Sequence, residues 1–221
     1  MAWSDPGDFT SGQILTAAQM DSVREAMFFG QATFTNEAAR DAAFGGSLAP
    51  IALQEGMRAY LTASTVAAST GNVTGTPTGI TTVYNGSVWV CTTPVAAKSN
   101  VAGTTTSTSF VTTLTGDGTA ISCTLVTGTT ALVTMSHQGA NSTAGQNNVI
   151  SLSVSGATTL AAADAQNATQ TAPAANYGMS LNRTQLITGL TAGTNTFTLN
   201  YRVTGGTATM NSRDFVVVGI A

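Results

Sequence analysis

Hydrophobic and polar residues alternate along most of the second half of the chain, and turn-forming residues separate the alternating runs. Phe197, Leu199, Tyr201 and Val203 are each followed or preceded by a polar residue, and residues 121–125 show the same pattern. A period of two places successive side chains on opposite faces of a strand, so one face of each run is expected to be core. The pattern predicts an antiparallel β-sandwich, jelly-roll-like, over residues 96–221. Further strands are expected at 110–114, 132–137, 149–154, 179–187 and 215–220.

A helix start is specified near the N-terminus. Thr16 and Gln19 match a capping box, in which the hydroxyl and the side-chain amide each satisfy a backbone amide of the first turn. The pattern predicts a helix over residues 17–29 that ends at Gly30. A second, shorter helix is expected over residues 36–44, stopped by the two glycines that follow.

The first of these helices has an apolar stripe but no core of its own. Met20, Val23 and Met27 recur at helical spacing, and Leu15 stands where it could pack against Met20. Short helices with few large apolar residues depend on tertiary packing for their stability. These four residues are therefore predicted to form an interface with another protein or with sister subunits. Residues 1–58 are expected to act as a helical anchoring segment.

A β-hairpin is predicted at residues 83–90. Asn85 and Gly86 stand between two β-rich arms, and both tolerate the positive φ that a two-residue type I′ turn requires. Residues 57–61 are a candidate third strand. The Thr-rich segment 62–80 contains several glycines and Pro77, and is expected to be a flexible polar loop. Together these features predict a small β-hairpin module over residues 59–95.

Charge is scarce and limits the partners. Charged residues make up 8% of the 221 residues, the net charge is −3, and Lys98 is the only lysine. Solubility must depend on Thr, Ser, Asn and Gln, and no basic stripe can neutralise phosphates, so nucleic acid is not an expected partner. The chain does not open on a signal-peptide pattern, and no apolar run approaches the roughly 18 residues that cross a bilayer. We expect synthesis in a cytoplasm and no membrane insertion.

Few side chains could perform catalysis. His137 is the only histidine, so a Ser-His-Asp triad would combine it with Asp117, Asp164 or Asp214, and no Gly-x-Ser-x-Gly elbow marks the serine. His137 shares a predicted strand face with apolar residues, which favours a core or subunit-interface histidine. The chain is therefore not expected to be an enzyme.

Metal and thiol chemistry also lack the residues they need. Cys91 and Cys123 have no Cys-x-x-Cys partner and no second histidine nearby, so no metal site and no cofactor are expected. Both are expected to be free thiols, and Cys123 to be a small core residue. Two long polar loops, 138–148 and 164–178, remain as candidates for recognition, because binding residues concentrate on loops held by a rigid scaffold.

Three stretches in the first ninety residues resemble structural proteins of tailed bacteriophages. Residues 11–20 resemble the opening G-x-x-L-T-A-A-x-(L/M)-N of such proteins, with Asp21 where Asn is common. Residues 55–61 and 82–90 are similar to the module E-G-x-x-A-Y-L … T-V-Y-(D/N)-G-S-x-W-V of minor tail and other virion surface proteins, chiefly of actinobacterial phages. The segment 62–80 is longer than in that module. Residues 190–197 and the last strand resemble phage β-sandwich domains more loosely.

The resemblance implies a non-enzymatic virion protein, either a minor tail or tail-fibre component or a head-decoration protein. Its N-terminus would dock on the particle and its C-terminal sandwich would be exposed. The implied partners are other capsid or tail proteins, and phage surface proteins of this kind are commonly homotrimers. A carbohydrate-binding host-adhesion protein, with Trp, Tyr and the polar loops on a cell-surface glycan, is the alternative. A cell-wall hydrolase with His137 as its base is a third hypothesis.

Overall fold

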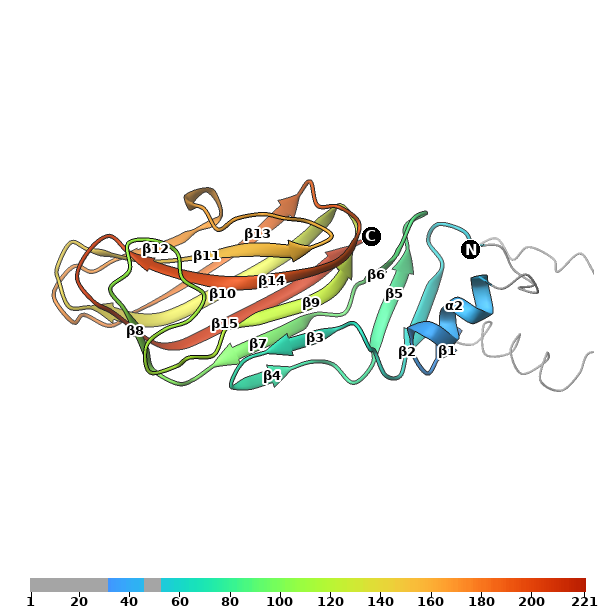
Figure 1. The fold of residues 1–221 in the computed structure, drawn as a ribbon, viewed down its shortest axis with the longest axis horizontal. Coiled ribbons are helices and arrows are strands. Elements are labelled where there is room, and N and C mark those ends of the chain that lie inside the picture. Colours follow the sequence, from blue (N-terminus) through green and yellow to red (C-terminus); the bar gives the residue numbers. More distant parts are fainter. Residues whose placement is uncertain (1–31, 46–52) are drawn as a thin grey trace, which may run out of the picture. The chain divides into compact units, whose positions relative to one another are not determined.

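Strands dominate the computed structural model, which describes residues 32–45 and 53–221 (Figure 1). Within this part of the chain lie one α-helix, α2 (Glu37–Gly45), and one short 3-10 helix, η1 (Asp164–Gln166). The strands form three sheets of four, six and five strands. The prediction of a mainly β chain with a helix near the N-terminus and a C-terminal β-sandwich is confirmed. The first of the two predicted helices, 17–29, lies outside the described residues.

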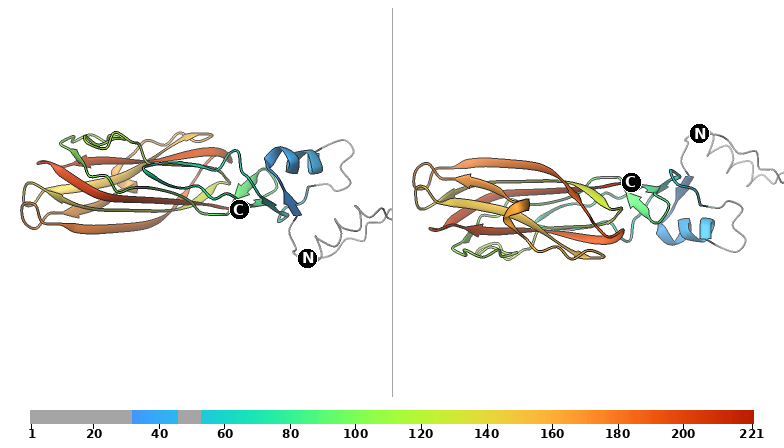
Figure 2. Two further views of the ribbon diagram at one scale, coloured as in Figure 1. Left: turned by 90° about the horizontal axis from the view of Figure 1, so that it is seen from below. Right: turned by 90° about the horizontal axis from the view of Figure 1, so that it is seen from above.

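Two of the sheets form the sandwich, and every strand pair in them is antiparallel (Figure 2). The six-stranded sheet has the order β13 (Met179–Thr188), β10 (Thr130–Asn141), β15 (Ala208–Ile220), β7 (Val95–Ser99) and β4 (Val73–Gly75), with β8 (Gly103–Thr105) also paired to β15. The five-stranded sheet has the order β12 (Ala168–Thr171), β11 (Asn147–Gly156), β14 (Gly193–Val203), β9 (Ser122–Thr127) and β3 (Ala68–Thr70).

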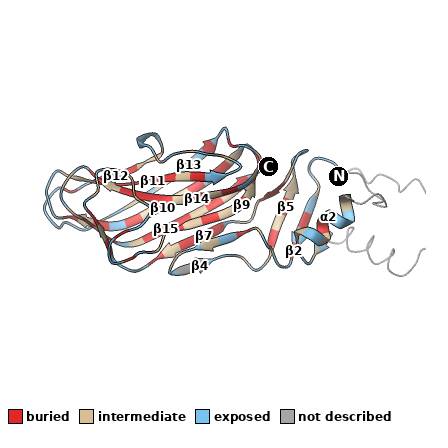
Figure 3. Cartoon of the chain, viewed as in Figure 1, coloured by how far each residue is buried: buried red, intermediate tan, exposed pale blue. Residues whose placement is uncertain are grey.

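The core lies between these two sheets, on the faces that the alternation predicts. Along β14, Phe197, Leu199, Tyr201 and Val203 are all fully buried. Phe215 and Val217 on β15 face them from the other sheet and are equally buried. Figure 3 shows buried and more exposed residues alternating along the long strands. Burying the apolar face of each sheet against the other is what makes this pairing of sheets stable.

The segment expected to be a flexible loop, 62–80, contains two strands instead. β3 pairs with β9 and β4 pairs with β7, so each adds one strand to a different sheet at the same side of the sandwich. Both strands are only three residues long. A strand of three residues is too short to show alternation in the sequence. Its backbone amides and carbonyls can still pair with the neighbouring strand at the edge of a sheet.

A strand expected at 110–114 is absent from the described structure, and this prediction was wrong. Only isolated bridges occur there, Val111 with Tyr201 and Leu114 with Asp117. The chain around this point crosses between the sheets, because β8 pairs with β15 of one sheet while Val111 bonds to β14 of the other. A crossing segment cannot keep a continuous ladder with either sheet.

The small sheet has the order β1 (Ala32–Phe34), β2 (Arg58–Leu61), β5 (Ile80–Tyr84) and β6 (Trp89–Cys91), and α2 packs on it. The Asn36 side chain caps α2 by accepting a hydrogen bond from the Ala39 amide at 3.0 Å. From the next turn, the buried Arg40 side chain lies 4.8 Å from the Trp89 ring centroid, and Phe44 lies 5.5 Å from the same ring. The second predicted helix and the third strand are confirmed.

The strands of the small sheet and of the sandwich do not divide at residues 58 and 95, where domain boundaries were expected. β1 and α2 come from the expected anchoring segment, yet they join the sheet of the expected hairpin module. β3 and β4 come from that module, yet they belong to the sandwich, and β7 already begins at Val95.

The β5–β6 hairpin is present, but its turn differs from the two-residue type I′ turn. Tyr84 pairs with Trp89, which leaves a loop of four residues between them. The Asn85 side-chain oxygen accepts hydrogen bonds from the backbone amides of Ser87 (3.1 Å) and Val88 (2.9 Å). Gly86 has a φ of +87°, whereas Asn85 does not have a positive φ. The asparagine therefore shapes the turn through its side chain.

Candidate functional site

Leu15, Met20, Val23 and Met27, the predicted interface residues, lie outside the described residues. Asn85 and Gly86 lie at the end of the hairpin, and the Asn85 side-chain oxygen bonds within the turn. The Asn85 side-chain nitrogen also lies close to Gly128, since a Cβ added to Gly128 would be 2.9 Å from it. The described residues contain five features that could serve a function: a buried ion pair, a buried histidine, two thiols, a row of exposed apolar residues and a group of loops.

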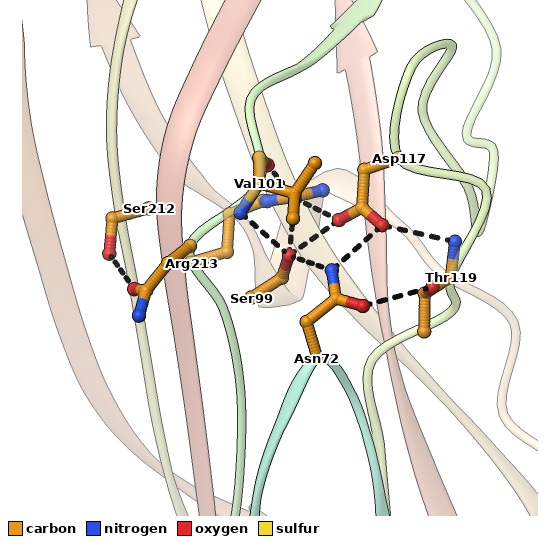
Figure 4. A network of polar contacts seen from close by, with 8 residues as sticks. Asn72, Ser99, Val101, Asp117, Thr119, Ser212 and Arg213 are labelled. Atoms are coloured by element: carbon orange, nitrogen blue, oxygen red, sulfur yellow. Dashed lines mark hydrogen bonds and ion pairs between the residues drawn. The ribbon is translucent and has the colours of Figure 1, made fainter.

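A buried polar network ties four segments together (Figure 4). The Arg213 guanidinium on β15 forms an ion pair with Asp117, and it also donates to Ser99 Oγ at 3.0 Å and to the Val101 carbonyl at 2.7 Å. Asn72, between β3 and β4, donates to Asp117 Oδ1 at 3.0 Å and to Ser99 Oγ at 2.7 Å. Arg213 is fully buried and Asp117 is 3% exposed. The network therefore fixes the crossing segment and the β3–β4 turn against the six-stranded sheet.

The charge of Asp117 is retained despite its burial. Burial alone would raise the pKa of this carboxyl, but hydrogen bonds from Ser99, Asn72 and Arg213 outweigh it and lower the pKa to about 2. In the sequence analysis, Asp117 was considered only as a possible member of a Ser-His-Asp triad. Nothing in the sequence pairs it with a residue 96 positions away.

His137 lies on the buried side of β10, next to Arg213. The two residues are directly opposite each other on β10 and β15, and His137 is 2% exposed. Neither ring nitrogen has a hydrogen-bond partner, and burial, with a contribution from the Arg213 charge, lowers the histidine pKa to about 4. Neither a serine hydroxyl nor a carboxylate contacts the ring. The structure thus favours the core-histidine interpretation over a triad.

The polar side chains flanking His137 face outward and border a shallow depression of about 330 Å³ on the six-stranded sheet. These outward residues are Ser136, Gln138, Ser180, Asn182, Ser212 and Asp214. His137 also borders this depression but is only 2% exposed, because neighbouring residues of a strand alternate between faces and its side chain points to the buried side of the sheet. Asp214 is paired with Lys98 at 3.3 Å and both are partly exposed.

Both cysteines are buried free thiols, as predicted. Burial raises the pKa of Cys91 to about 11 and that of Cys123 to about 12. They are therefore protonated at neutral pH and lack the thiolate that a nucleophile or metal ligand needs. Among the described residues, no group of three or more His, Cys, Asp or Glu is placed to hold a metal ion.

An apolar row lies on the outer face of the six-stranded sheet, at the end where β15 finishes. Leu132 is directly opposite Leu186 on β13 and Val218 on β15. Leu132, Leu186 and Ile220 are 38%, 57% and 42% exposed. We call Leu132, Leu186, Val218 and Ile220 the outer apolar row. Contiguous exposed apolar residues of this kind mark interaction surfaces more often than isolated ones do.

Three loops gather at the other end of the sandwich: 142–146, 172–178 and 204–207. Backbone hydrogen bonds join the first loop to each of the others, from Gly145 to the Ala172 carbonyl at 2.8 Å and from Ser142 to the Thr207 carbonyl at 2.9 Å. These loops, here called the loop tip, include parts of both long polar segments singled out in the sequence. Tyr177 is 54% exposed there.

No helix in the described part of the chain is long and apolar enough to cross a membrane.

No family model matches the chain, and no curated protein is significantly similar in sequence. A tumour-necrosis-factor structure, Eiger from S. frugiperda, is 14% identical over 58% of this chain and 93% of its own, with a TM-score of 0.40. A particle protein of infectious bursal disease virus is 10% identical over 65% of this chain and 41% of its own, with a TM-score of 0.41.

A carbohydrate-binding module from a Cellvibrio mixtus lichenase, in complex with cellotriose, is 12% identical over 54% of this chain and 88% of its own, with a TM-score of 0.28. The neighbours thus include virus particle proteins and carbohydrate-binding modules. Identities and scores this low carry no conclusion about the fold or the role of this chain.

Replacing Asp117 by Asn should destabilise the protein by about 3–5 kcal/mol, because it leaves the buried Arg213 charge uncompensated. The matched control is Asp214→Asn, which removes a partly exposed pair and should cost under about 1 kcal/mol. Urea denaturation of both variants measures the two values. Equal, small losses would show that the buried network does not hold the crossing segment.

Acid should weaken the fold through His137 before it affects the carboxylates. The folded pKa is about 4 and the ordinary value is 6.5, so the unfolded chain takes up the proton first as the pH falls. The free energy of unfolding should drop between pH 6.5 and pH 4, by up to about 3 kcal/mol. Denaturation at pH 7 and pH 4.5 should show this slope in the wild type and a flatter one in His137→Leu. The same slope in both proteins would contradict the assignment.

Proposed function

We propose that this protein is a non-enzymatic structural component of a tailed-bacteriophage particle, either a minor tail or tail-fibre protein or a head-decoration protein. It is synthesised in the cytoplasm of the bacterial host and joins the particle through its N-terminal segment. Its sandwich is exposed on the particle. The partners are other capsid or tail proteins.

One observation supports this proposal above the others. The two stretches that resemble the phage virion module, 55–61 and 82–90, are separated in sequence but fold together as β2, β5 and β6 of one sheet. Gly56 and Tyr84, one from each stretch, are also joined by a 2.8 Å backbone hydrogen bond. The resemblance therefore applies to one folded unit, which contains the Trp89 cluster.

The placement of the reactive side chains supports a non-enzymatic role. His137 is buried with a pKa near 4, and the thiols of Cys91 and Cys123 are protonated. A general base or nucleophile has to reach its substrate and has to hold or release a proton near the working pH. These three groups have neither property.

We further propose that the protein assembles as a homotrimer and that the outer apolar row lies between its subunits. In a chain with 8% charged residues, the row is a patch of large apolar side chains on a face that otherwise carries mainly hydroxyls and amides, together with the Lys98–Asp214 ion pair. Association of subunits around a symmetry axis would remove it from water.

Replacing Leu186 by Lys should reduce the molar mass of the isolated protein, measured by light scattering, from that of three chains to that of one. The reason is that an unpaired charge would be buried in the subunit contact. The control is Tyr60→Lys, which changes an exposed aromatic residue on the small sheet and should leave the trimer intact. A monomeric wild type at micromolar concentration, or a trimeric Leu186→Lys variant, would contradict the proposal.

A carbohydrate-binding host-adhesion role remains the second candidate. The burial of the aromatic residues indicates which of them could contact a sugar. Trp89 is 7% exposed and packed against Phe44 and Arg40, so it cannot stack on a sugar. Tyr177 at the loop tip is the exposed aromatic residue beside the polar loops. This role is compatible with membership of the particle.

Deleting residues 1–31 should leave a cooperatively melting protein that no longer joins particles. The cut is placed before β1 because a deletion to residue 58 would remove β1 and α2 and expose Trp89. Met20→Glu with Met27→Glu should mimic the deletion, since both residues belong to the predicted stripe. Ser22→Glu, off the stripe, is the matched control.

Copy number in purified particles, measured by quantitative mass spectrometry, decides the outcome. Normal incorporation of the truncated protein would show that the attachment site lies elsewhere. Absence of the wild-type protein from purified particles would overturn the proposed function itself.

A further inference from the structure

The loop tip lies at the end of the sandwich opposite the small sheet. β15 begins at Ala208, directly after the loop 204–207, and runs to Ile220. The last part of β15 meets the small sheet, because an added Cβ on Gly219 would lie 2.6 Å from the Cys91 carbonyl oxygen. In Figure 1 the loop tip is at the left and the C-terminus at the other end of β15.

The loop tip is held in a fixed arrangement by Asn141, the fully buried last residue of β10. Its side-chain nitrogen donates to the Gly205 carbonyl at 3.1 Å and to Asn148 Oδ1 at 3.0 Å, and its side-chain oxygen accepts from the Thr143 amide at 3.0 Å. Its backbone carbonyl accepts from the Asn176 amide at 2.7 Å. One side chain and its carbonyl thus contact all three loops. A surface that is already ordered loses little conformational entropy on binding.

A strained residue places an aromatic ring on this surface. Asn176 has a φ of +58°, and it is the single non-glycine residue with a positive φ in the described part of the chain. Tyr177 follows directly, is 54% exposed, and closes a turn by donating from its amide to the Ala174 carbonyl at 3.2 Å. Strained backbone persists where the surroundings enforce it, and such positions cluster at binding sites.

The chemistry of the loop tip is neutral and rich in hydrogen-bonding groups. None of residues 142–146, 172–178 and 204–207 is charged. Ser142 and Thr143 carry exposed hydroxyls and Asn176 an exposed amide, and Tyr177 is exposed in the same group of loops. The Thr204 hydroxyl is already used, because it donates to Gln146 Oε1 at 2.9 Å and accepts from the Asn147 amide at 2.8 Å. A charged ligand would find no opposite charge there, which argues against phosphates, nucleic acids and anionic polysaccharides. A flat apolar face with hydroxyl and amide groups around it suits the C–H face and the hydroxyls of an uncharged sugar.

We propose that the loop tip is a binding site for a neutral glycan on the host cell surface, with Tyr177 as the stacking platform. The biological setting, a particle surface exposed to the host cell, rests on the proposed function. A single aromatic platform gives weak binding, with a Kd on the order of 1 mM for a short oligosaccharide. Several copies on one particle would raise the overall affinity through multivalency.

Saturation-transfer NMR of the full-length protein tests the site directly. The probes are three neutral trisaccharides, maltotriose, mannotriose and chitotriose, with trisialic acid as the charged comparison. We expect at least one neutral sugar to give a signal that falls about fivefold or more in Tyr177→Ala and is kept in Tyr177→Phe, which preserves the ring. Tyr60→Ala, at an exposed tyrosine outside the loop tip, is the control and should bind as the wild type does.

Each of three results would overturn the site: no neutral trisaccharide gives a signal at millimolar concentration, the signal is unchanged in Tyr177→Ala, or trisialic acid binds in preference. The melting temperature of Tyr177→Ala should match the wild type, since the ring is mostly in solvent. Particle incorporation separates this proposal from the proposed function. A Tyr177→Ala protein that incorporates normally while its particles adsorb poorly to host cells supports both, whereas wild-type protein that binds sugar but is absent from particles contradicts only the proposed function.

Discussion

The ion pair between Arg213 and Asp117 is the constraint on which the arrangement of the sandwich depends. The two residues come from β15 and from the segment that crosses between the sheets, and Ser99 and Asn72 complete the contact from β7 and the β3–β4 turn. A charge this deeply buried is tolerated only while its partner and its hydrogen bonds are in place. The pair therefore locks a segment without regular structure and the strands at one side of the sandwich onto the longest strand of the fold.

Outside this network the protein is held together largely by uncharged groups. Thr124 and Thr196 on β9 and β14 share a 2.9 Å hydrogen bond, and the Asn195 side chain donates to Thr127 Oγ1 at 2.8 Å. Hydroxyl and amide contacts are common because charged residues are scarce, although Lys98–Asp214 and Arg202–Asp164 are ion pairs outside the network. The same choice of residues leaves the loop tip neutral, so the composition that makes the fold also limits what it can recognise.

The sequence predicted the elements that have a local or periodic pattern of residues. Alternation at Phe197 to Val203 identified a core strand, and Asn36 with the glycines after residue 44 bounded a helix, because both signals are local and periodic. Strands β3 and β4 are too short to show a period. The turn at Asn85 depends on hydrogen bonds to the asparagine side chain, but its Asn-Gly sequence is the same as that of a type I′ turn.

The candidate sites were harder to predict, because they form between residues distant in the chain. Nothing near Asp117 marks Arg213 as its partner, and nothing near Asn141 indicates that it braces three loops. The long polar segments did indicate where the loop tip would be found. The expected interface at Met20, Val23 and Met27 lies outside the described residues and stays a prediction.

The central claim is that this chain is a particle component attached by its N-terminal segment, with the loop tip outermost. The most direct measurement is electron cryomicroscopy of purified particles carrying a small density label inserted after Gly145, an exposed residue of the loop tip where an added Cβ would meet nothing within 4 Å. The account predicts label density at the outer limit of a symmetric projection from the capsid or tail. Label density against the particle surface, or none at all on intact particles, would contradict it.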